Sequence, residues 1–419
     1  MADVMSVTEK KERANAESFQ KMVDSDPVLI DIGKAGNVVP DMPPNMILTS
    51  GPSMPWESYY GGQKDAIIGA ALFEGLGNSR SEIEQKLSSE EIRVGGCHDY
   101  GCVGSLAGVY SASMSVFVVE NPESGNRGFC NLYEGTNPRR LNYGIYDEEV
   151  KERLLFVEDT IVPVLRQAIV QSGGIALKPL MARALHMGDE LHSRNTAASL
   201  LFAQQLFPHV LDYGDSSLVR SAMTAITEDN YFFLRLSMAA AKVMADASHG
   251  VEYSSTVSAM AFNCCNFAIR VSGLGSQWIT GPHADVEAKL FAGHNQDEIT
   301  WMGGESTITE TVGLGGFAQA AAFPLQKYQG GSAEAMVDRN LGLYEITVGE
   351  HPTFHIPYLG YRGTPTAIDV FKVRETGIRP VMDIGIAGRD GGQIGAGIVS
   401  APMSIFDDAC ALYNKKYPT

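Results

Sequence analysis

The hydrophobic pattern of the chain changes twice along its length, and this constrains the fold more than any other feature. From Asp147 to about Gly250, apolar residues recur with helical spacing, which predicts helices over residues 150–170, 177–207, 217–226 and 229–247. On both sides of this stretch, short apolar runs end in glycine or proline turns, as strands do. We therefore predict an α/β protein of the mixed α+β, multidomain kind, with an orthogonal helical subdomain inserted between two mixed alpha/beta domains.

The length of the chain also favours several domains. Its 419 residues exceed the roughly 250 to 300 at which a single hydrophobic core stops growing. We expect an N-terminal helix and alpha/beta domain over 1–146, the helical subdomain over 147–250, and a glycine-rich alpha/beta domain over 251–419. The expected strands lie near 28–33, 45–50, 92–97, 116–120, 127–132, 342–348 and 381–386, and further helices are expected at the N-terminus (capped by Thr8), over 64–75 and near 316–323.

The charge balance excludes several kinds of partner. The chain has 32 Lys and Arg residues against 49 Asp and Glu, a net charge of -17, which repels nucleic acids and anionic membrane surfaces. No apolar run reaches transmembrane length, and the charged N-terminus is unlike a secretory leader. The six cysteines are scattered, so we expect reduced thiols and a cytoplasmic location. An anionic substrate would then need local arginines or exposed backbone N–H groups.

The densest group of reactive side chains lies in Met187–Asn195. Because this stretch falls within a predicted helix, Asp189 and His192 would share one face, and Glu190 and Arg194 would pair on an adjacent one. An acid, a base and the Asn195 amide could then meet on an active-site helix. The alternative is a polar helix start with an intrahelical ion pair.

A second candidate is the loop Gly95–Gly104, which follows a predicted strand and contains Cys97, His98 and Asp99. Loops at strand ends host functional side chains more often than cores do. The alternative is a buried cysteine beside a structural histidine. Zinc ligands are present, but their spacing is unspecific, so a metal is possible and none is predicted.

Three glycine-rich turns could present N–H groups to an anion, and tight turn packing is the alternative for each. They span 270–275, 303–316 and 388–397. Asn131 could hydrogen-bond an amide substrate, or it could satisfy a turn. Our candidate catalytic residues are therefore His192, Asp189, Glu190 and His98, and our candidate substrate-binding residues are Arg194, Asn195, Asn131, Arg270, Ser272, Gly273, Thr309, Glu310 and Gln393.

Several sequence blocks together resemble the YlbE-like (AllG-type) family, and their order and spacing agree from about residue 48 to 405. The blocks are Leu72–Gly75, Ser111–Met114 with Val119–Asn121, Met187–Asn195, Ile269–Gly275, Ile308–Thr311 and Gly392–Gly397. The resemblance implies one subunit of a multi-subunit oxamate carbamoyltransferase of anaerobic allantoin and purine breakdown. It further implies that oxalurate and the co-substrate phosphate yield oxamate and carbamoyl phosphate, with carbamate kinase acting downstream. The implied partners are FdrA-like and YlbF-like subunits in an oligomer; no cofactor is predicted.

The chain departs from ordinary transcarbamoylases, because it lacks their Ser-Thr-Arg-Thr and His-Pro-x-Gln patterns. It also has Asp99 where some family members have a second histidine, and the family varies at His186. As a hypothesis, Arg270 and Arg194 neutralise a carboxylate or phosphate, and His192, oriented by Asp189, passes a proton to the leaving amide. The alternatives are an amidohydrolase acting on another ureido or cyclic amide compound, and a non-catalytic scaffold subunit.

Overall fold

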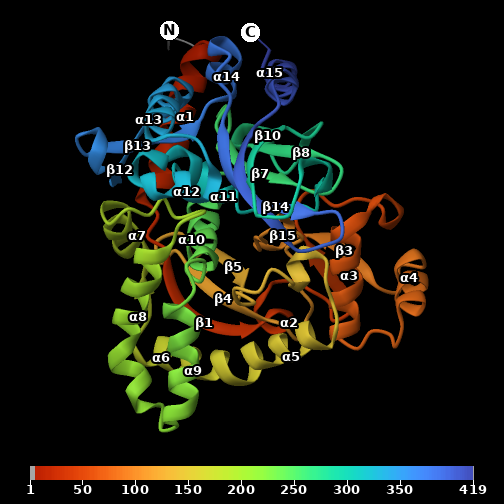
Figure 1. The fold of residues 1–419 in the computed structure, drawn as a ribbon. Coiled ribbons are helices and arrows are strands. Elements are labelled where there is room, and N and C mark those ends of the chain that lie inside the picture. Colours follow the sequence, from red (N-terminus) through yellow and green to blue (C-terminus); the bar gives the residue numbers. More distant parts are fainter. Residues whose placement is uncertain (1–4, 419) are drawn as a thin grey trace.

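The computed structural model describes residues 5–418, and these form a mixed α/β fold with several sheets, as predicted. Helix α10 (Leu234–Ala247) runs through the middle of the molecule, and both described chain ends lie at the top of the view in Figure 1. Every residue of α10 from Leu234 to Ala245 is buried. A helix that is buried on all sides requires packing partners all round. Helix α10 contacts α1 (Val7–Asp24), α7 (Leu177–His186), α11 (Ile308–Thr311), β4 (Ser115–Glu120) and β5 (Arg127–Asn131).

The N-terminal part contains an antiparallel sheet of order β5-β4-β1-β6. The expected strand pair near 116–132 is confirmed. A parallel pair, β2 with β3, lies beside this sheet and leads into the His98 loop. The elements are α1 (Val7–Asp24), β1 (Val28–Lys34), α2 (Ala35–Val38), β2 (Met46–Thr49), α3 (Gly61–Phe73), α4 (Arg80–Ser88), β3 (Arg93–Gly96), β4 (Ser115–Glu120), β5 (Arg127–Asn131) and β6 (Ile175–Ala176).

The cap of the first helix differs from our prediction. Ser6, rather than Thr8, caps α1: its side chain accepts the Glu9 N–H at 3.3 Å, and the Glu9 carboxylate accepts the Ser6 N–H at 2.7 Å. This reciprocal pair is a capping box, which requires a glutamate three residues after the cap. Thr8 has Lys11 at that position, so it cannot form the same box.

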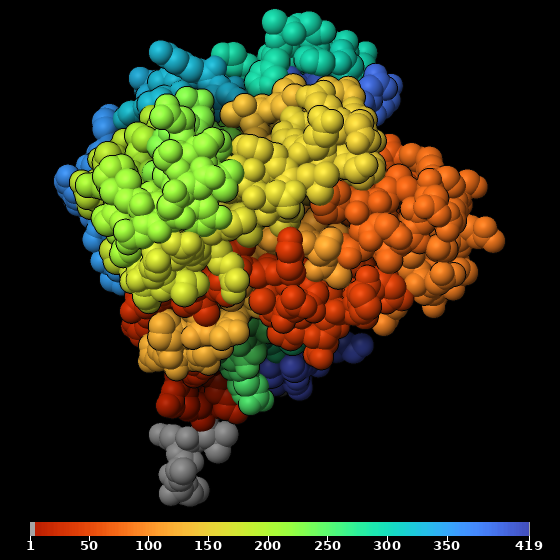
Figure 2. Space-filling model, turned by 90° about the horizontal axis from the view of Figure 1, so that it is seen from below, coloured from red at the N-terminus to blue at the C-terminus, as the bar shows by residue number. Residues whose placement is uncertain are grey.

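The middle of the chain is helical, as predicted, with α5 (Glu148–Phe156), α6 (Val162–Gln171), α7 (Leu177–His186), α8 (Thr196–Val210) and α9 (Ser216–Thr227) before α10. The single helix expected over 177–207 is wrong, because residues 187–195 form a loop between α7 and α8. Gly188 (φ 99°) and Leu191 (φ 72°) adopt left-handed conformations that an α-helix does not allow. In Figure 2 the yellow and green segments that contain α5–α9 cover one part of the lower face.

The C-terminal part contains an antiparallel sheet of order β10-β15-β14-β11, a three-stranded sheet β7-β8-β9 and the hairpin β12-β13. The strands are β7 (Val257–Phe262), β8 (Phe267–Val271), β9 (Ile279–Gly281), β10 (Asp285–Leu290), β11 (Ile299–Thr300), β12 (Thr347–Ile356), β13 (Arg362–Ile368), β14 (Val381–Gly388) and β15 (Gln393–Ser400). The helices are α11 (Ile308–Thr311), α12 (Gln326–Gln329), α13 (Ala333–Leu343), α14 (Val370–Thr376) and α15 (Met403–Lys416).

Two expectations for this part are wrong. Residues 315–325 contain three short 3-10 turns in place of the alanine-rich helix, because Gly315, Gly316 and Pro324 interrupt helical hydrogen bonding. The strand expected over 342–348 begins only at Thr347, because α13 continues to Leu343 and a 3-10 turn follows it. The strand expected over 381–386 is confirmed as β14.

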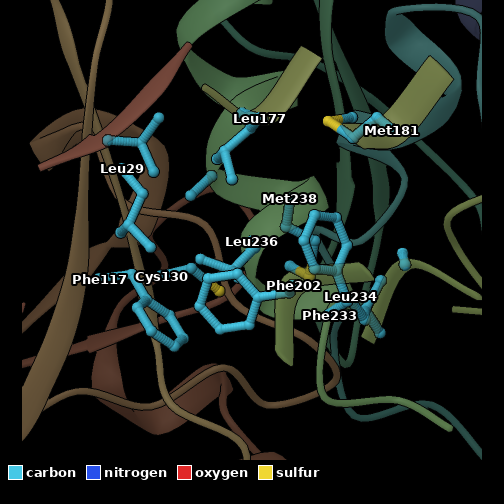
Figure 3. Close-up of a cluster of buried hydrophobic side chains, with 14 of the residues drawn as sticks. Leu29, Phe117, Cys130, Leu177, Met181, Phe202, Phe233, Leu234, Leu236 and Met238 are labelled. Carbon is cyan, nitrogen blue, oxygen red and sulfur yellow. The ribbon is translucent and has the colours of Figure 1, made fainter. Parts of the chain in front are cut away.

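The largest core joins residues that lie far apart in sequence. Leu29 and Phe117 of the first sheet meet Phe202 of α8 and Phe233 beside α10, as Figure 3 shows. Phe354 of β12 belongs to the same core, so the core takes side chains from all three expected domains. Those domain boundaries stay a prediction. Within residues 5–418 no helix is both long and apolar enough to cross a membrane.

Candidate functional site

A small cavity of about 40 Å³ lies where the three parts of the chain meet. The N-terminal part supplies Arg140 and five other lining residues, α10 supplies Arg235, and β15 supplies Gln393. The lining residues are Ser105, Leu106, Tyr133, Arg140, Asn142, Tyr143, His192, Ser193, Tyr231, Leu234, Arg235, Ser306, Gly385 and Gln393. We call this space the arginine cavity.

His192 and Ser193 reach the arginine cavity from the loop between α7 and α8, and the Glu190 side chain holds this loop in shape. The buried Glu190 carboxylate accepts the backbone N–H groups of His192 at 3.1 Å, of Ser193, and of Arg194 at 3.0 Å. Glu190 therefore braces the loop and does not form the predicted side-chain pair with Arg194. In a loop the i,i+4 spacing no longer places two side chains on one face.

The His192 imidazole is paired with Glu310, a residue 118 positions away in sequence. The distance from His192 Nδ1 to Glu310 Oε1 is 2.7 Å, and both side chains are buried. Burial lowers the pKa of His192, but the Glu310 carboxylate and then Asp383 outweigh burial, so the pKa is raised above its ordinary value. His192 therefore holds a proton more tightly than a free histidine does and can act as a general acid.

Glu310 is itself held by the glycine-rich segment that we expected to bind an anionic ligand. Its Oε1 accepts the N–H groups of Gly316 at 2.9 Å and of Asp383 at 3.0 Å, and its Oε2 accepts the Thr309 hydroxyl at 2.9 Å. Gly315 passes so close that an added Cβ would lie 2.1 Å from Glu310 Oε1. The glycine-rich segment thus packs around and hydrogen-bonds the Glu310 carboxylate instead of an anionic ligand. Thr309 positions the same carboxylate and does not contact the arginine cavity.

Two more buried carboxyl groups lie behind His192. Burial and the neighbouring Asp383 carboxylate raise the pKa of Glu190 well above its ordinary value. Burial and Glu310 likewise raise the pKa of Asp383, and one Asp383 oxygen has no hydrogen-bond partner within residues 5–418. Protons are therefore retained in this cluster, because several negative charges cannot be kept together out of water.

Arg140 lies against the opposite wall of the arginine cavity, on a turn that Glu134 anchors. The Glu134 carboxylate accepts the N–H groups of Leu141 at 2.6 Å and Asn142 at 3.1 Å, just after Arg140. The Arg140 guanidinium donates to Tyr133 Oη at 2.6 Å and to Gln393 Oε1 at 3.0 Å. It is 5% exposed, and no carboxylate among the described residues forms an ion pair with it.

Arg235 is the second buried arginine of the cavity, and it is 3% exposed. Its guanidinium donates to Asn131 Oδ1 at 3.1 Å and lies 5.7 Å from the centre of the Tyr133 ring. Its Nε has no partner, and within residues 5–418 no carboxylate is close enough to form an ion pair. Asn131 is thus a positioning residue behind Arg235 and does not line the cavity.

Tyrosines complete the wall around the two guanidinium groups. The Arg140 guanidinium lies 4.5 Å from the centre of the Tyr143 ring, and the rings of Tyr133 and Tyr231 stack with their centres 6.4 Å apart. Burial raises the pKa of Asp229 to about 6, although both arginines lower it, and its carboxylate accepts the Tyr231 N–H. Aromatic faces attract cations, so the rings replace part of the missing counter-charge.

The other predicted residues of the 187–195 loop have structural contacts. Asp189 does not orient His192: its Oδ2 accepts the Ala198 N–H at 2.8 Å and so caps α8. Burial raises the pKa of Asp189 to about 6. Arg194 donates to the Gly188 carbonyl at 2.9 Å, and the Asn195 amide donates to the His192 carbonyl at 2.7 Å. None of these three side chains lines the arginine cavity.

His98 and Arg270 lie together, but outside the arginine cavity. The His98 ring packs edge-on against Trp278, with ring centres 5.4 Å apart, and neither of its nitrogens has a partner among the described residues. Burial lowers the pKa of His98 well below its ordinary value. The Arg270 guanidinium forms an ion pair with Asp99 and stacks on Trp278 at 4.2 Å from the ring centre. An arginine already paired with a carboxylate is poorly suited to neutralise a substrate.

Of the three remaining predicted binding residues, Ser272 and Gly273 pack within the fold. The Ser272 hydroxyl donates to the Ser248 carbonyl at 2.7 Å, and a Cβ at Gly273 would lie 2.4 Å from the Ser254 carbonyl oxygen. The glycine turn at 270–275 is therefore a packing turn. Gln393, by contrast, lines the arginine cavity, since it begins β15 at the end of the β14-β15 hairpin.

Sequence reasoning missed Arg140, Arg235, Ser193, Asp383 and the tyrosines. A signal was present for two of them: Arg235 and Asp383 each interrupt an apolar run, and a charge in a buried run needs a partner or a ligand. No local signal separates Arg140 from its neighbour Arg139, whose side chain is 54% exposed and paired with Asp147. Among residues 5–418, no three His, Cys, Asp or Glu side chains are grouped so that they could hold a metal ion.

Comparison with known proteins places this geometry in a family. The family described as "Oxamate carbamoyltransferase subunit AllG" matches residues 92–306. The chain is 40% identical to "Uncharacterized protein YahG" of Escherichia coli (strain K12), over 98% of this chain and 88% of that one. It is 36% identical to "Oxamate carbamoyltransferase subunit AllG" of the same organism, over 95% of this chain and 96% of that one.

A solved structure agrees with the fold over its whole length. It is described as "Crystal structure of a conserved protein of unknown function from Enterococcus faecalis V583" and has a TM-score of 0.96 and 37% identity. The similarity covers 99% of this chain and all of that one. The sequence identities, their coverage and the family match together show that this chain belongs to the AllG family.

Proposed function

We propose that the chain is a subunit of a carbamoyltransferase and that its arginine cavity binds oxalurate for phosphorolysis to oxamate and carbamoyl phosphate. One observation carries the proposal: Arg140 and Arg235 line one cavity, both are buried, and neither has a carboxylate partner among the described residues. Keeping two guanidinium charges out of water costs several kcal/mol each unless an anion joins them. A small carboxylate would supply that charge and could accept two hydrogen bonds from each guanidinium.

His192, on the other wall of the arginine cavity, can supply the proton that is needed when the C–N bond of oxalurate breaks. A phosphate oxygen attacks the ureido carbon and forms a C–O bond, and the C–N bond to the oxamate nitrogen breaks. That nitrogen must gain a proton as it leaves, and His192, protonated and backed by Glu310, can donate it. Microscopic reversibility lets the same histidine accept the proton when the reaction runs backwards.

The family membership supports the substrate class, since the relative named as an oxamate carbamoyltransferase subunit shares 36% identity over nearly the whole chain. The product oxamate carries one carboxylate next to a planar amide. The stacked tyrosines and the planar guanidinium groups of the cavity suit such a flat anion. We further propose that FdrA-like and YlbF-like subunits complete the enzyme.

The test is phosphate-dependent oxamate release from oxalurate by the reconstituted subunits. Replacing Arg140 by Met should reduce kcat/KM by at least 100-fold, because one charge-assisted contact to the carboxylate is lost. Arg139→Met is the matched control, since this neighbouring arginine is exposed and paired with Asp147; it should retain full activity. Equal activity of the two variants would reject the proposed site. Release of oxamate without phosphate would instead indicate a hydrolase.

A further inference from the structure

A second cavity, of about 280 Å³, lies behind the loop that carries His192 and Ser193. Strand β10 contributes Glu287 and Lys289 to its wall, and α13 contributes Arg339. Gln319 and Gln329 line it from the segment that leads into α13. One ordered water needs roughly 10 to 15 Å³ of such space, so this cavity can hold a small ion with part of its hydration shell.

The second cavity is open to solvent on the side of β10, where Glu287 and Lys289 are exposed, and Arg339 is half-buried. The Arg339 guanidinium donates to the neutral Gln319 side chain, and Lys289 Nζ donates to the Lys327 carbonyl at 2.6 Å. Within residues 5–418 neither cation forms an ion pair with a carboxylate. Among the residues that the structure describes, Glu287 is the one acidic side chain that lines the space, so positive charge exceeds negative charge there. In a chain with a net charge of -17, this local excess is unusual and favours an anion.

A hydrogen bond joins a side chain that lines the second cavity to one that lines the arginine cavity. Gln329 lines the second cavity, Ser193 lines the arginine cavity, and Gln329 Nε2 donates to Ser193 Oγ at 3.0 Å. Gln319, also in the second cavity, donates to Asp383, whose N–H donates to the Glu310 carboxylate that holds His192. The second cavity is therefore linked to both residues of the 187–195 loop that face the proposed substrate, directly to Ser193 and through Asp383 and Glu310 to His192.

We propose that the second cavity binds inorganic phosphate, the acceptor of the carbamoyl group; this inference rests on the proposed function above. Arg339 and Lys289 would neutralise the phosphate oxygens. Phosphate near neutral pH carries at least one P–O–H group, and the Glu287 carboxylate can accept that hydrogen. Sulfate has the same shape and charge but no hydrogen to donate, so this site should prefer phosphate to sulfate.

The experiment is equilibrium dialysis of the purified full chain against labelled inorganic phosphate, with saturating oxamate present to fill the arginine cavity. Arg339→Gln should weaken phosphate binding by at least tenfold, since a charge-assisted contact is lost. Arg220→Gln, which changes an exposed arginine of α9, should leave phosphate binding unchanged. If Arg339→Gln fails to fold, Lys289→Gln should show the same weakening.

The outcomes separate this inference from the proposed function. Loss of oxamate binding in Arg140→Gln tests the arginine cavity, whereas loss of phosphate binding in Arg339→Gln tests the second cavity. Phosphate affinity equal to that of the native chain in both Arg339→Gln and Lys289→Gln would overturn the assignment. Sulfate that displaced phosphate at equal concentration would also overturn it, because the site would then bind an adventitious ion only.

Discussion

Replacing Arg235 by Met should stabilise the protein and at the same time abolish ligand binding, and this opposite pair of effects tests the reasoning most directly. A structural arginine is normally paired, and removing one partner of a buried ion pair costs about 3 to 5 kcal/mol. Among residues 5–418 no carboxylate forms an ion pair with Arg235, although Asp229 is near enough for both buried arginines to lower its pKa. The other contacts of Arg235 include a hydrogen bond to Asn131 and the Tyr133 ring at 5.7 Å. The buried charge of Arg235 therefore destabilises the folded protein when no ligand is bound.

The size of the stabilisation follows from these contacts. Replacing buried ionic groups by apolar ones of similar volume gains about 1 to 4 kcal/mol. The substitution also removes the guanidinium group that donates to Asn131 Oδ1, and this loss lowers the free energy of unfolding by about 1 to 3 kcal/mol. We expect the free energy of unfolding to rise by about 1 kcal/mol, because an unbranched methionine fills the space of the arginine stem.

Urea unfolding measures the stability, and calorimetric titration with oxamate measures the binding. Arg220→Met, at an exposed position of α9, is the control, and its stability should stay within about 0.5 kcal/mol of the native value. Arg235→Met should lose oxamate binding by 100-fold or more. A loss of 3 kcal/mol or more in stability, or unchanged oxamate affinity, would refute the view that Arg235 is held for a ligand.

Three further predictions concern single side chains. Glu310→Gln should move the alkaline limb of the pH–rate profile of oxamate release to lower pH, because burial lowers the pKa of His192 and only Asp383 then opposes it; an unmoved limb would exclude His192 as the acid. Asp189→Asn should keep turnover, and at about pH 4 it should keep the native stability, because asparagine caps a helix as well as aspartate does; Asp189→Ala should lose about 1 to 2 kcal/mol in urea unfolding at that pH. As pH rises from about 4 to about 6 the native chain should lose about 3 kcal/mol of stability, since burial raises the pKa of Asp189 to about 6 in the folded state; Asp189→Asn should not show this loss and should be the more stable protein above about pH 6. His98→Phe should leave oxamate release within a few-fold of native, because its ring nitrogens have no partner in the described structure and phenylalanine can keep the edge contact with Trp278; a 100-fold loss would show that His98 acts in the reaction.

The sequence predicted the local elements well where a pattern repeats over many residues. The helical periodicity of 147–250 and the alternation of strands with turns on either side follow from short-range spacing, so the α/β class and most elements could be predicted. The prediction was wrong over 187–195, because composition resembled a helix while Gly188 and Leu191 adopt positive φ values. Backbone strain of this kind is supported by tertiary contacts, here the Gly315 N–H that donates to the Glu190 carbonyl at 2.8 Å and the Ser237 hydroxyl that donates to the Leu191 carbonyl at 2.8 Å.

The sequence alone also identified the segment that carries His192, although as a helix, and the family to which the chain belongs. It could not decide what surrounds that histidine, since its partner Glu310 lies 118 residues away and Arg140 meets Gln393 across 253 residues. Nor could it separate Arg140 from Arg139, because adjacent arginines are alike until the fold buries one and exposes the other. Spacing encodes which residues are neighbours along an element, whereas burial and counter-charge depend on how distant elements pack, and only the tertiary structure determines these.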